Sequence, residues 1–376
     1  MAEWRECKLG EVINLKRGYD LPHRDRRPGP FPIVSSSGIT EYHDTAKVHG
    51  PGVITGRYGT LGKVFYVEGD FWPLNTSLYV QDFKGNDPRF ISFFLQTLNL
   101  GTKNAAGAVP GVNRNHLHMI DVCIPPLKEQ RRIAEILSAY DELIENSQRR
   151  IQILETMART LYREWFVQFN FPGHEKVKIT NGLPDGWEVK RMPECVDINP
   201  RTAVPRNGEK PFLPMGSLSK DSMIISNIGS RAGNSGAKFQ NGDTLFARIT
   251  PCLENGKTGF VQFLPDAEAV AFGSTEFIVL RSQTLTPEFV YCLARSDEFR
   301  ANAIKSMTGA SGRQRVQQEC FNDYKIYQPP GALLDHFAAI VAPSFVMIHK
   351  LHLQIQNLRQ TRDLLLPRLL SGKVEV

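Results

Sequence analysis

The sequence predicts an α+β protein in which two similar mixed α/β domains are separated by two long antiparallel helices that form an intramolecular coiled coil. Three observations support this prediction. The diprolines Pro125-Pro126 and Pro329-Pro330 lie 204 residues apart, a heptad pattern follows each of them, and the two patterns stay in register. A repeat of this length is too long for a solenoid or a propeller. It therefore indicates a tandem duplication of one domain and one helix.

The heptad patterns predict helices over residues 127–166 and 331–372. A diproline prevents helix before each pattern. The 3.5-residue spacing favours a coiled-coil seam over the 3.6-residue period of a helix on a globular core. The core positions of the first pattern are Ile133, Leu137, Tyr140, Ile144, Ser147, Ile151, Leu154, Ala158, Leu161 and Trp165. Those of the second are Phe337, Val341, Ser344, Ile348, Leu351, Ile355, Leu358, Arg362, Leu365 and Leu369.

Two residues make the second pattern less regular. Pro343 falls inside it and is expected to kink or restart the helix. Arg362 occupies a core position where an apolar residue is expected. We expect each seam to pair with the other one, and pairing between two copies of the chain is the alternative. A helix of some 40 residues would be about 60 Å long.

The remaining sequence predicts domains over residues 1–126 and 187–330, with a linker over residues 167–186. Each domain contains strand-like runs rich in β-branched and aromatic residues, bounded by Gly, Asn and Pro. These runs are residues 52–55, 62–67 and 77–80 in the first domain and 243–248, 256–261 and 275–280 in the second. A short helix follows in each, over residues 88–95 and 287–293. The domains share this order but little residue identity.

Composition indicates a soluble, cytoplasmic protein. The chain is 41% hydrophobic and 22% charged, and we expect no membrane contact because no apolar run approaches twenty residues. The charged N-terminus lacks a secretory signal. Six widely spaced cysteines without a C-x-x-C pair argue against zinc and for a reducing compartment. The net charge of +6 is compatible with nucleic-acid binding but does not by itself indicate it.

The sequence predicts no catalytic and no metal-ligating residue. It contains no phosphate-binding loop, no dinucleotide fingerprint and no Asn-Pro-Pro-aromatic tetrapeptide of amino-methyltransferases. Asp185 and Glu188 are too close in sequence to approach one metal ion from separate strands. The histidine pairs lack a third ligand at metal-binding spacing. These pairs are His116 with His118 and His349 with His352.

Three segments resemble the specificity subunit of type I restriction–modification systems. Residues 125–138, Pro-Pro-Leu-Lys-Glu-Gln-Arg-Arg-Ile-Ala-Glu-Ile-Leu-Ser, are similar to the central helix signature of that family. Residues 183–188 resemble the start of a target-recognition domain, and residues 364–373 resemble the family's usual ending. The second diproline departs from the pattern, because residues 329–334 lack the Glu-Gln of the first copy.

This resemblance implies a non-catalytic subunit that recognises double-stranded DNA. Each target-recognition domain would read one half of a split target, and the helices would set the gap and bind two methyltransferase subunits. Restriction/translocase subunits would join that core. S-adenosylmethionine, ATP and magnesium would belong to the partners, and this chain would bind no cofactor. Because the domains differ, the half-sites should differ too, about 34 Å apart on successive turns of the duplex.

Polar residues in Gly-rich loops are the candidates for DNA contact, because Arg reads guanine and Asn or Gln reads adenine. Arg57 and Arg248 each end a strand-like run before a turn and a Gly-Lys, and Arg114 and Arg313 each lie in a Gly-rich segment before the last strand. We therefore expect these two pairs to match in the duplication. The candidates are Arg24, Arg26, Arg27, Arg57, Tyr58, Lys63, Asn113, Arg114, Arg201, Arg206, Arg231, Arg248, Lys257, Arg313, Gln314 and Arg315.

Three alternatives remain open from the sequence. The chain could be the specificity subunit of a modification-only or type IIB system, which neighbouring genes would reveal. It could be a DNA-cleaving enzyme in its own right, which would cut DNA with metal and no partner. It could also be a scaffold that joins proteins through its helices and ignores DNA.

Overall fold

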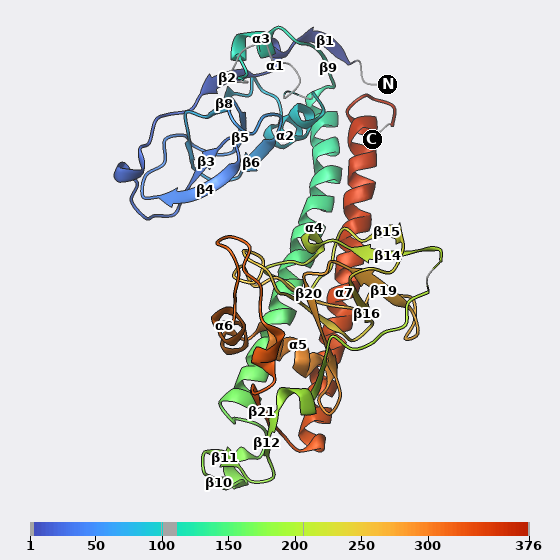
Figure 1. Cartoon of the computed structure of the whole chain (residues 1–376). Coiled ribbons are helices and arrows are strands. Elements are labelled where there is room, and N and C mark those ends of the chain that lie inside the picture. Colours follow the sequence, from blue (N-terminus) through green and yellow to red (C-terminus); the bar gives the residue numbers. More distant parts are fainter. Residues whose placement is uncertain (1–3, 99, 101–110, 206, 375–376) are drawn as a thin grey trace. The chain divides into compact units, whose positions relative to one another are not determined.

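The computed structural model describes residues 4–98, 100, 111–205 and 207–374 (Figure 1). The chain divides into two compact units, residues 1–145 with 356–376, and residues 146–355. Each unit contains one mixed α/β domain and one end of each of two long helices, α4 (Leu127–Tyr162) and α7 (Gly331–Leu369). The predicted α+β class is therefore confirmed.

The first domain is built on a four-stranded antiparallel sheet in the order β2-β8-β5-β6. A smaller sheet, β4-β3-β7, pairs β3 with β7 in parallel. The strands are β1 (Arg5–Lys8), β2 (Asn14–Arg17), β3 (Phe31–Ser35), β4 (Gly38–His43), β5 (Gly52–Gly56), β6 (Val64–Val67), β7 (Trp72–Pro73), β8 (Ser77–Asp82) and β9 (Asp121–Ile124). The helices are α1 (Leu9–Val12), α2 (Pro88–Thr97) and α3 (Arg114–His118), with a 3-10 turn, η1 (His23–Asp25).

The second domain repeats this topology. Its main antiparallel sheet has the order β13-β20-β17-β18, and its second sheet, β15-β14-β19-β16, again contains one parallel pair, β14 with β19. In both domains a two-stranded ribbon joins the first and last strands, β1 with β9 and β12 with β21. The strands are β12 (Glu188–Arg191), β13 (Val196–Ile198), β14 (Glu209–Leu213), β15 (Gly229–Ala232), β16 (Ala237–Gln240), β17 (Thr244–Ala247), β18 (Thr258–Phe260), β19 (Val270–Gly273), β20 (Phe277–Ser282) and β21 (Lys325–Gln328). The helices are α5 (Pro287–Arg295) and α6 (Asp297–Lys305), and a hairpin, β10 (Ile179–Thr180) with β11 (Leu183–Pro184), precedes the domain.

Equivalent helices in the two domains begin with the same local chemistry. Asp87 accepts a hydrogen bond from the N–H of Phe90 at the start of α2, and Thr286 accepts one from Phe289 at the start of α5. A proline follows each cap, where its missing N–H costs nothing. The cap and the proline together determine where each helix begins.

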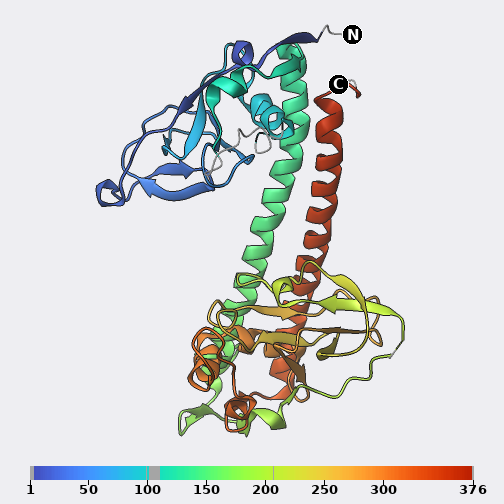
Figure 2. The same cartoon turned by 45° about the horizontal axis from the view of Figure 1, so that its top comes forward.

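The heptad prediction is confirmed, because all twenty predicted core positions are buried or half-buried. In the first unit, Ile133 and Leu137 near the start of α4 share a core with Leu369 near the end of α7. In the second unit, the rings of Trp165, just after α4, and Phe337, in the first turns of α7, lie 6.1 Å apart. The helices therefore run antiparallel and side by side within each unit (Figure 2).

Two irregular positions have a physical explanation. Arg362 Nη1 donates to Asp141 Oδ1 at 2.5 Å, so the guanidinium at this core position has an anionic partner on α4. The expected break at Pro343 is wrong, since α7 is not interrupted there. Pro343 and Ala339 are both exposed, so water can reach the Ala339 carbonyl, which has lost its helical donor.

Gln130 shows why the first diproline is followed by Glu-Gln. Its side chain is 2% exposed and satisfies both of its polar atoms: Oε1 accepts from the N–H of Asp87, and Nε2 donates to Asn86 Oδ1 and to the Pro125 carbonyl. The preceding Glu129 accepts from the indole of Trp4 at 3.2 Å. These contacts attach the start of α4 to the first domain.

By length and composition alone, α7 could cross a membrane, since its most apolar 18-residue window has a mean hydropathy of 1.7. The sequence predicted no such segment, and because the core helix of a soluble protein can meet the same criterion, the absence of membrane contact stays a prediction. The high value arises because α7 carries apolar residues outside the seam as well as within it. Only 28% of the window is buried, and the exposed side chains include Ile340, Val346, Met347 and Leu353.

Candidate nucleic-acid interface

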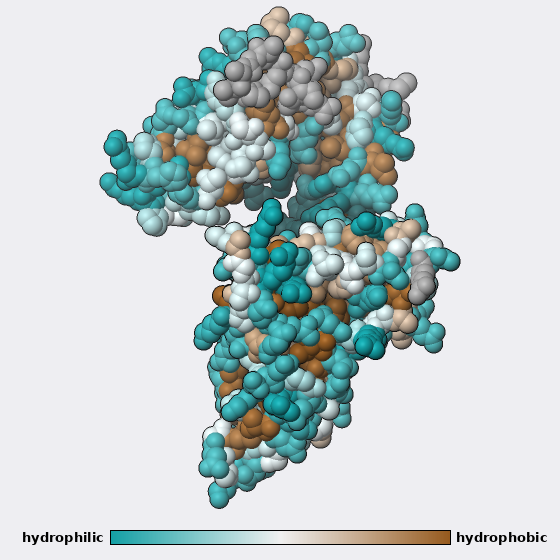
Figure 3. All heavy atoms as spheres, in the orientation of Figure 1, coloured by the Kyte–Doolittle hydropathy of each residue, from teal (hydrophilic) through white to brown (hydrophobic). Residues whose placement is uncertain are grey.

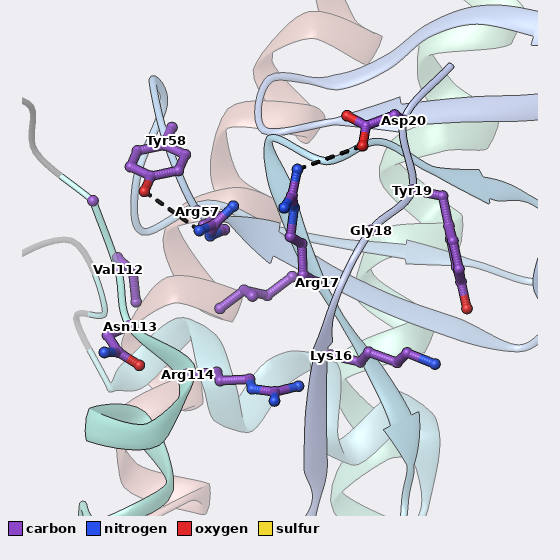
Figure 4. A pocket seen from close by; sticks show the side chains of 12 residues that line it. Lys16, Arg17, Gly18, Tyr19, Asp20, Arg57, Tyr58, Val112, Asn113 and Arg114 are labelled. Atoms are coloured by element: carbon purple, nitrogen blue, oxygen red, sulfur yellow. Dashed lines mark hydrogen bonds and ion pairs between the residues drawn. The ribbon is translucent and has the colours of Figure 1, made fainter.

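A cationic cavity of about 670 Å³ opens at one end of the main sheet of the first domain. Three segments line it: residues 16–20 at the end of β2, Arg57 and Tyr58 after β5, and residues 111–114 before and at the start of α3 (Figure 4). The lining residues are Lys16, Arg17, Gly18, Tyr19, Asp20, Arg57, Tyr58, Leu78, Gly111, Val112, Asn113 and Arg114. Four cations against one carboxylate give the cavity a net positive charge.

The second domain has a cavity of about 790 Å³ at the corresponding end of its main sheet. Residues 199–203 follow β13 and Arg248 follows β17, much as residues 16–20 lie at the end of β2 and Arg57 follows β5 in the first domain. The cations are Arg201, Lys238 and Arg248, and no carboxylate is among the lining residues. The lining residues are Asn199, Pro200, Arg201, Thr202, Ala203, Gly236, Ala237, Lys238, Arg248, Thr275, Phe277 and Val279.

The backbone places Arg57 and Arg248 at equivalent positions, as the sequence predicted. The Arg57 N–H donates to the Thr76 carbonyl at 2.9 Å, and its own carbonyl accepts from Val112 at 2.9 Å. In the second domain the Arg248 N–H donates to the Glu276 carbonyl at 3.0 Å, and its carbonyl accepts from Val316 at 2.8 Å. Each arginine therefore joins the central strand to the segment after the short helices.

The same hydrogen bonds correct the second predicted pair. Because Val112 and Val316 are equivalent, Arg114 corresponds to Gln318 rather than to Arg313. The bridges Tyr58–Gly111 and Ile249–Arg315 give the same alignment. The prediction failed because it matched Gly-rich composition, whereas equivalence in these segments is set by pairing with a distant strand.

The two equivalent arginines have different surroundings. The guanidinium of Arg57 lies over the Tyr58 ring, with Cζ 4.5 Å from the ring centroid and Nη2 3.4 Å from the tyrosine hydroxyl. Arg248 instead donates from Nη2 to the Val316 carbonyl at 3.4 Å. Arg57 is thus held against a side chain, and Arg248 is partly engaged by the backbone.

Four of the predicted residues on the first domain and two on the second line these cavities. Arg57, Tyr58, Asn113 and Arg114 are brought together in the first cavity, and Arg201 and Arg248 in the second. Gln314 does not line the second cavity, and its N–H donates to the Thr250 hydroxyl at 3.0 Å. Lys63 is exposed beyond the turn after Arg57 and does not line the first cavity.

The other predicted residues lie elsewhere. Arg26 is bound to Glu41 at 2.9 Å and to the Leu21 carbonyl, which makes it part of the loop structure. Arg315 pairs with Glu276 at 2.8 Å. Arg231 lies on β15 over the Phe212 ring. The remaining candidates lie at exposed or half-buried positions outside the cavities, and they are Arg24, Arg27, Lys257 and Arg313. Arg206 falls outside the described residues.

Lys16, Arg17, Asn199 and Lys238 were missed by sequence reasoning. The basic pair Lys16-Arg17 directly before Gly18 is a usable signal, because it ends a strand at a glycine. The strand register makes Lys16 and Asn199 equivalent: Leu15 pairs with Val80, and Ile198 pairs with Leu280. The Asn199 side chain has a structural role, because its Oδ1 accepts from the Val279 N–H at 2.9 Å and its Nδ2 donates to Gln318.

Comparison with known proteins gives one consistent result. Residues 1–156 match the family model described as the type I restriction modification DNA specificity domain. The MjaIX specificity subunit of Methanocaldococcus jannaschii is 26% identical over 76% of this chain and 68% of its own length. The EcoEI specificity subunit of Escherichia coli is 31% identical over 39% of this chain and 26% of its own length.

A solved structure supports the fold over the whole length. The S subunit of a type I restriction–modification system from M. genitalium has a TM-score of 0.66, with 16% identity, and the match covers 98% of this chain and 96% of that one. At this identity the likeness concerns the fold alone. The sequence relatives and the family model over residues 1–156 make this chain similar to type I restriction–modification specificity subunits.

Proposed function

We propose that this chain is a non-catalytic subunit that reads an asymmetric, two-part DNA target and docks methyltransferase subunits. One observation carries the proposal. The two domains share the strand order of their main sheets, and each presents a cationic cavity at the same end of that sheet, beside the equivalent Arg57 or Arg248 but with different side chains around it. A duplicated site with altered lining residues is what a reader of two different half-sites requires.

The chemistry of both cavities suits duplex DNA. Lysine and arginine neutralise phosphates and release counterions, which supplies affinity for any sequence. Arginine and asparagine additionally read guanine and adenine edges in the major groove. The first cavity offers Arg57, Arg114 and Asn113 for this purpose, and the second offers Arg201 and Arg248.

Exposed apolar side chains on the long helices support partner docking. In the first unit these are Ile136, Leu143 and Leu364, and in the second Ile153, Met157, Ile340, Val346, Met347 and Leu353. Figure 3 shows apolar side chains on the visible face of both units, among hydrophilic ones. Clustered exposed apolar surface marks protein interfaces. We assign this surface to methyltransferase subunits, which would bring S-adenosylmethionine, while restriction subunits would bring ATP and magnesium.

A selection from random duplex DNA tests the proposal. The probe is the full chain assembled with a methyltransferase subunit of a type I system. We expect enrichment of two unlike short motifs separated by a fixed, unread gap. Absence of any enriched motif would refute DNA reading. Cleavage of DNA by the chain alone with a divalent metal would refute the non-catalytic assignment.

A further inference from the structure

Arg57 is held in a defined orientation by its neighbour. Its guanidinium is stacked on the Tyr58 ring at 4.5 Å, and Nη2 also donates to the Tyr58 hydroxyl at 3.4 Å. Figure 4 shows Arg57 between Tyr58 and Arg17 in the cavity wall. A stacked arginine has fewer accessible rotamers, so less entropy is lost when it binds a base. The stack therefore prepares the donor pair of Arg57 for bidentate binding.

Gly111 makes this stack possible. Tyr58 and Gly111 pair as neighbouring backbone segments, and the Tyr58 ring lies across the glycine. A Cβ at position 111 would lie 2.4 Å from Cε1 of Tyr58 and 2.9 Å from its Cδ1. Both distances are too short for non-bonded carbon atoms, so any side chain at this position must displace the ring. Gly111 is thus part of the orientation of Arg57 although it offers no donor of its own.

The second domain has replaced every member of this arrangement except the arginine. Ile249 stands at the position of Tyr58, and Arg315 stands at the position of Gly111. Arg315 is bound by Glu276 at 2.8 Å, and Arg248 donates to the Val316 carbonyl. An isoleucine offers no ring for stacking, so Arg248 lacks the aromatic surface over which the Arg57 guanidinium lies. The two domains therefore present their equivalent arginines differently.

We propose that Tyr58 is a specificity-determining positioning residue, which together with Gly111 fixes Arg57 for bidentate recognition of one guanine in the half-site read by the first domain. The acceptors would be O6 and N7 of that guanine, the pair that a guanidinium matches in the major groove. This inference rests on the proposed function. Arg248, which lies over no aromatic ring in the described part of the chain, should contribute a weaker guanine preference to the other half-site.

The experiment compares the base preferences of Tyr58→Leu, Tyr58→Phe and Gly111→Ala with the wild type in the assembled complex. Preferences come from the random-DNA selection and from binding to the selected duplex carrying 7-deazaguanine at each guanine. We expect the wild type to lose about tenfold in affinity at one position of one half-site when N7 is removed. Tyr58→Leu and Gly111→Ala should abolish that preference, while Tyr58→Phe should keep it because the ring remains.

A second arginine–tyrosine stack in the same domain supplies the matched control. Arg89 lies over the Tyr66 ring at 4.2 Å and pairs with Glu68 at 3.1 Å, away from the cavity lining. Tyr66→Leu should leave every base preference unchanged. A wild-type split motif with an unchanged guanine preference in Tyr58→Leu would overturn this inference alone. Equal weakening of the base preference at all positions in Tyr58→Leu would also overturn it. If the wild type itself selected no motif, the proposed function would be rejected instead.

Discussion

Arg57 and Arg248 occupy the same backbone position in two domains of one chain. Each donates its N–H to the carbonyl that precedes an inner strand, Thr76 or Glu276, and accepts from a valine on the other side, Val112 or Val316. Their side chains nevertheless meet different partners, Tyr58 in one domain and the Val316 carbonyl in the other. The duplication has thus kept the scaffold of the site and changed its chemistry.

Lys16 is expected to contribute to DNA affinity through phosphate rather than through base contacts. It lines the first cavity, whereas its equivalent Asn199 carries no charge and is bonded to Val279 and Gln318. Lys16→Ala should reduce the slope of log affinity against log salt concentration by about 0.9, as expected for one lost phosphate contact. Binding titrations at several salt concentrations measure this slope. A change in base preference with an unchanged slope would contradict the assignment.

Glu155 is expected to stabilise the second unit through a buried network. Its carboxylate is 3% exposed and accepts from the Met223 N–H at 2.9 Å and from the Tyr291 hydroxyl, with Arg295 4.0 Å away. Glu155→Ala would leave the buried Arg295 guanidinium without its anion, which costs about 3–5 kcal/mol. Glu155→Gln should cost less because the amide oxygen can still accept.

Urea unfolding of the full chain, followed by circular dichroism, measures this loss. The exposed Glu135 on the same helix provides the control, and Glu135→Ala should shift the midpoint little. If Glu155→Ala and Glu135→Ala gave the same midpoint, the buried network would not stabilise the unit.

His118 is expected to make the first domain less stable at acidic pH. The Leu15 N–H donates to His118 Nε2 at 2.9 Å, which requires a neutral ring. Burial lowers the pKa of His118, and the charges of Arg114 and Lys84 lower it further. Above about pH 6.5 the His118 ring is neutral in both the folded and the unfolded chain, so its hydrogen bond contributes its full stabilisation. As the pH falls below that value, the unfolded chain binds the proton first and stability is lost.

His118→Gln removes this titration and should flatten the dependence of the unfolding midpoint on pH between about 7.5 and 5. An identical slope in wild type and His118→Gln would show that another group titrates in this range.

The long helices are expected to set the gap between the half-sites. Inserting four residues of matching heptad character into both α4 and α7 should lengthen the pair by about 6 Å. This corresponds to nearly two base-pair steps of about 3.4 Å. The selected motif should keep both half-sites and gain about two base pairs of gap. A changed half-site with the original gap would contradict a spacer function.

The sequence predicted the helices well because a heptad period reports burial directly. Even Ser147 and Arg362, which break the apolar pattern, lie at buried or half-buried positions. Arg362 could not be explained from the sequence, because its partner Asp141 lies on the other helix. A pattern identifies which face is buried, but it does not identify the side chain opposite.

The candidate sites were predicted only in part. Arg57 and Arg248 were matched because each follows a strand with a clear alternation. Arg114 was matched to the wrong partner, since its equivalence to Gln318 is set by hydrogen bonds to the Arg57 and Arg248 carbonyls, which composition does not reveal. Gly111 had no individual signal, because its importance depends on the ring of Tyr58, which lies far away in the sequence.

The central claim, that each domain reads one half-site through its own cavity, is tested most directly by random-DNA selection with three assembled complexes. These contain the wild type, Arg57→Ala and Arg248→Ala. Arg57→Ala should relax the base preference in one half-site only, and Arg248→Ala should relax it in the other. At any base contacted bidentately, the loss of discriminating binding free energy should be about 1–3 kcal/mol. Unchanged motifs in both variants, or relaxation of the same half by both, would contradict the account.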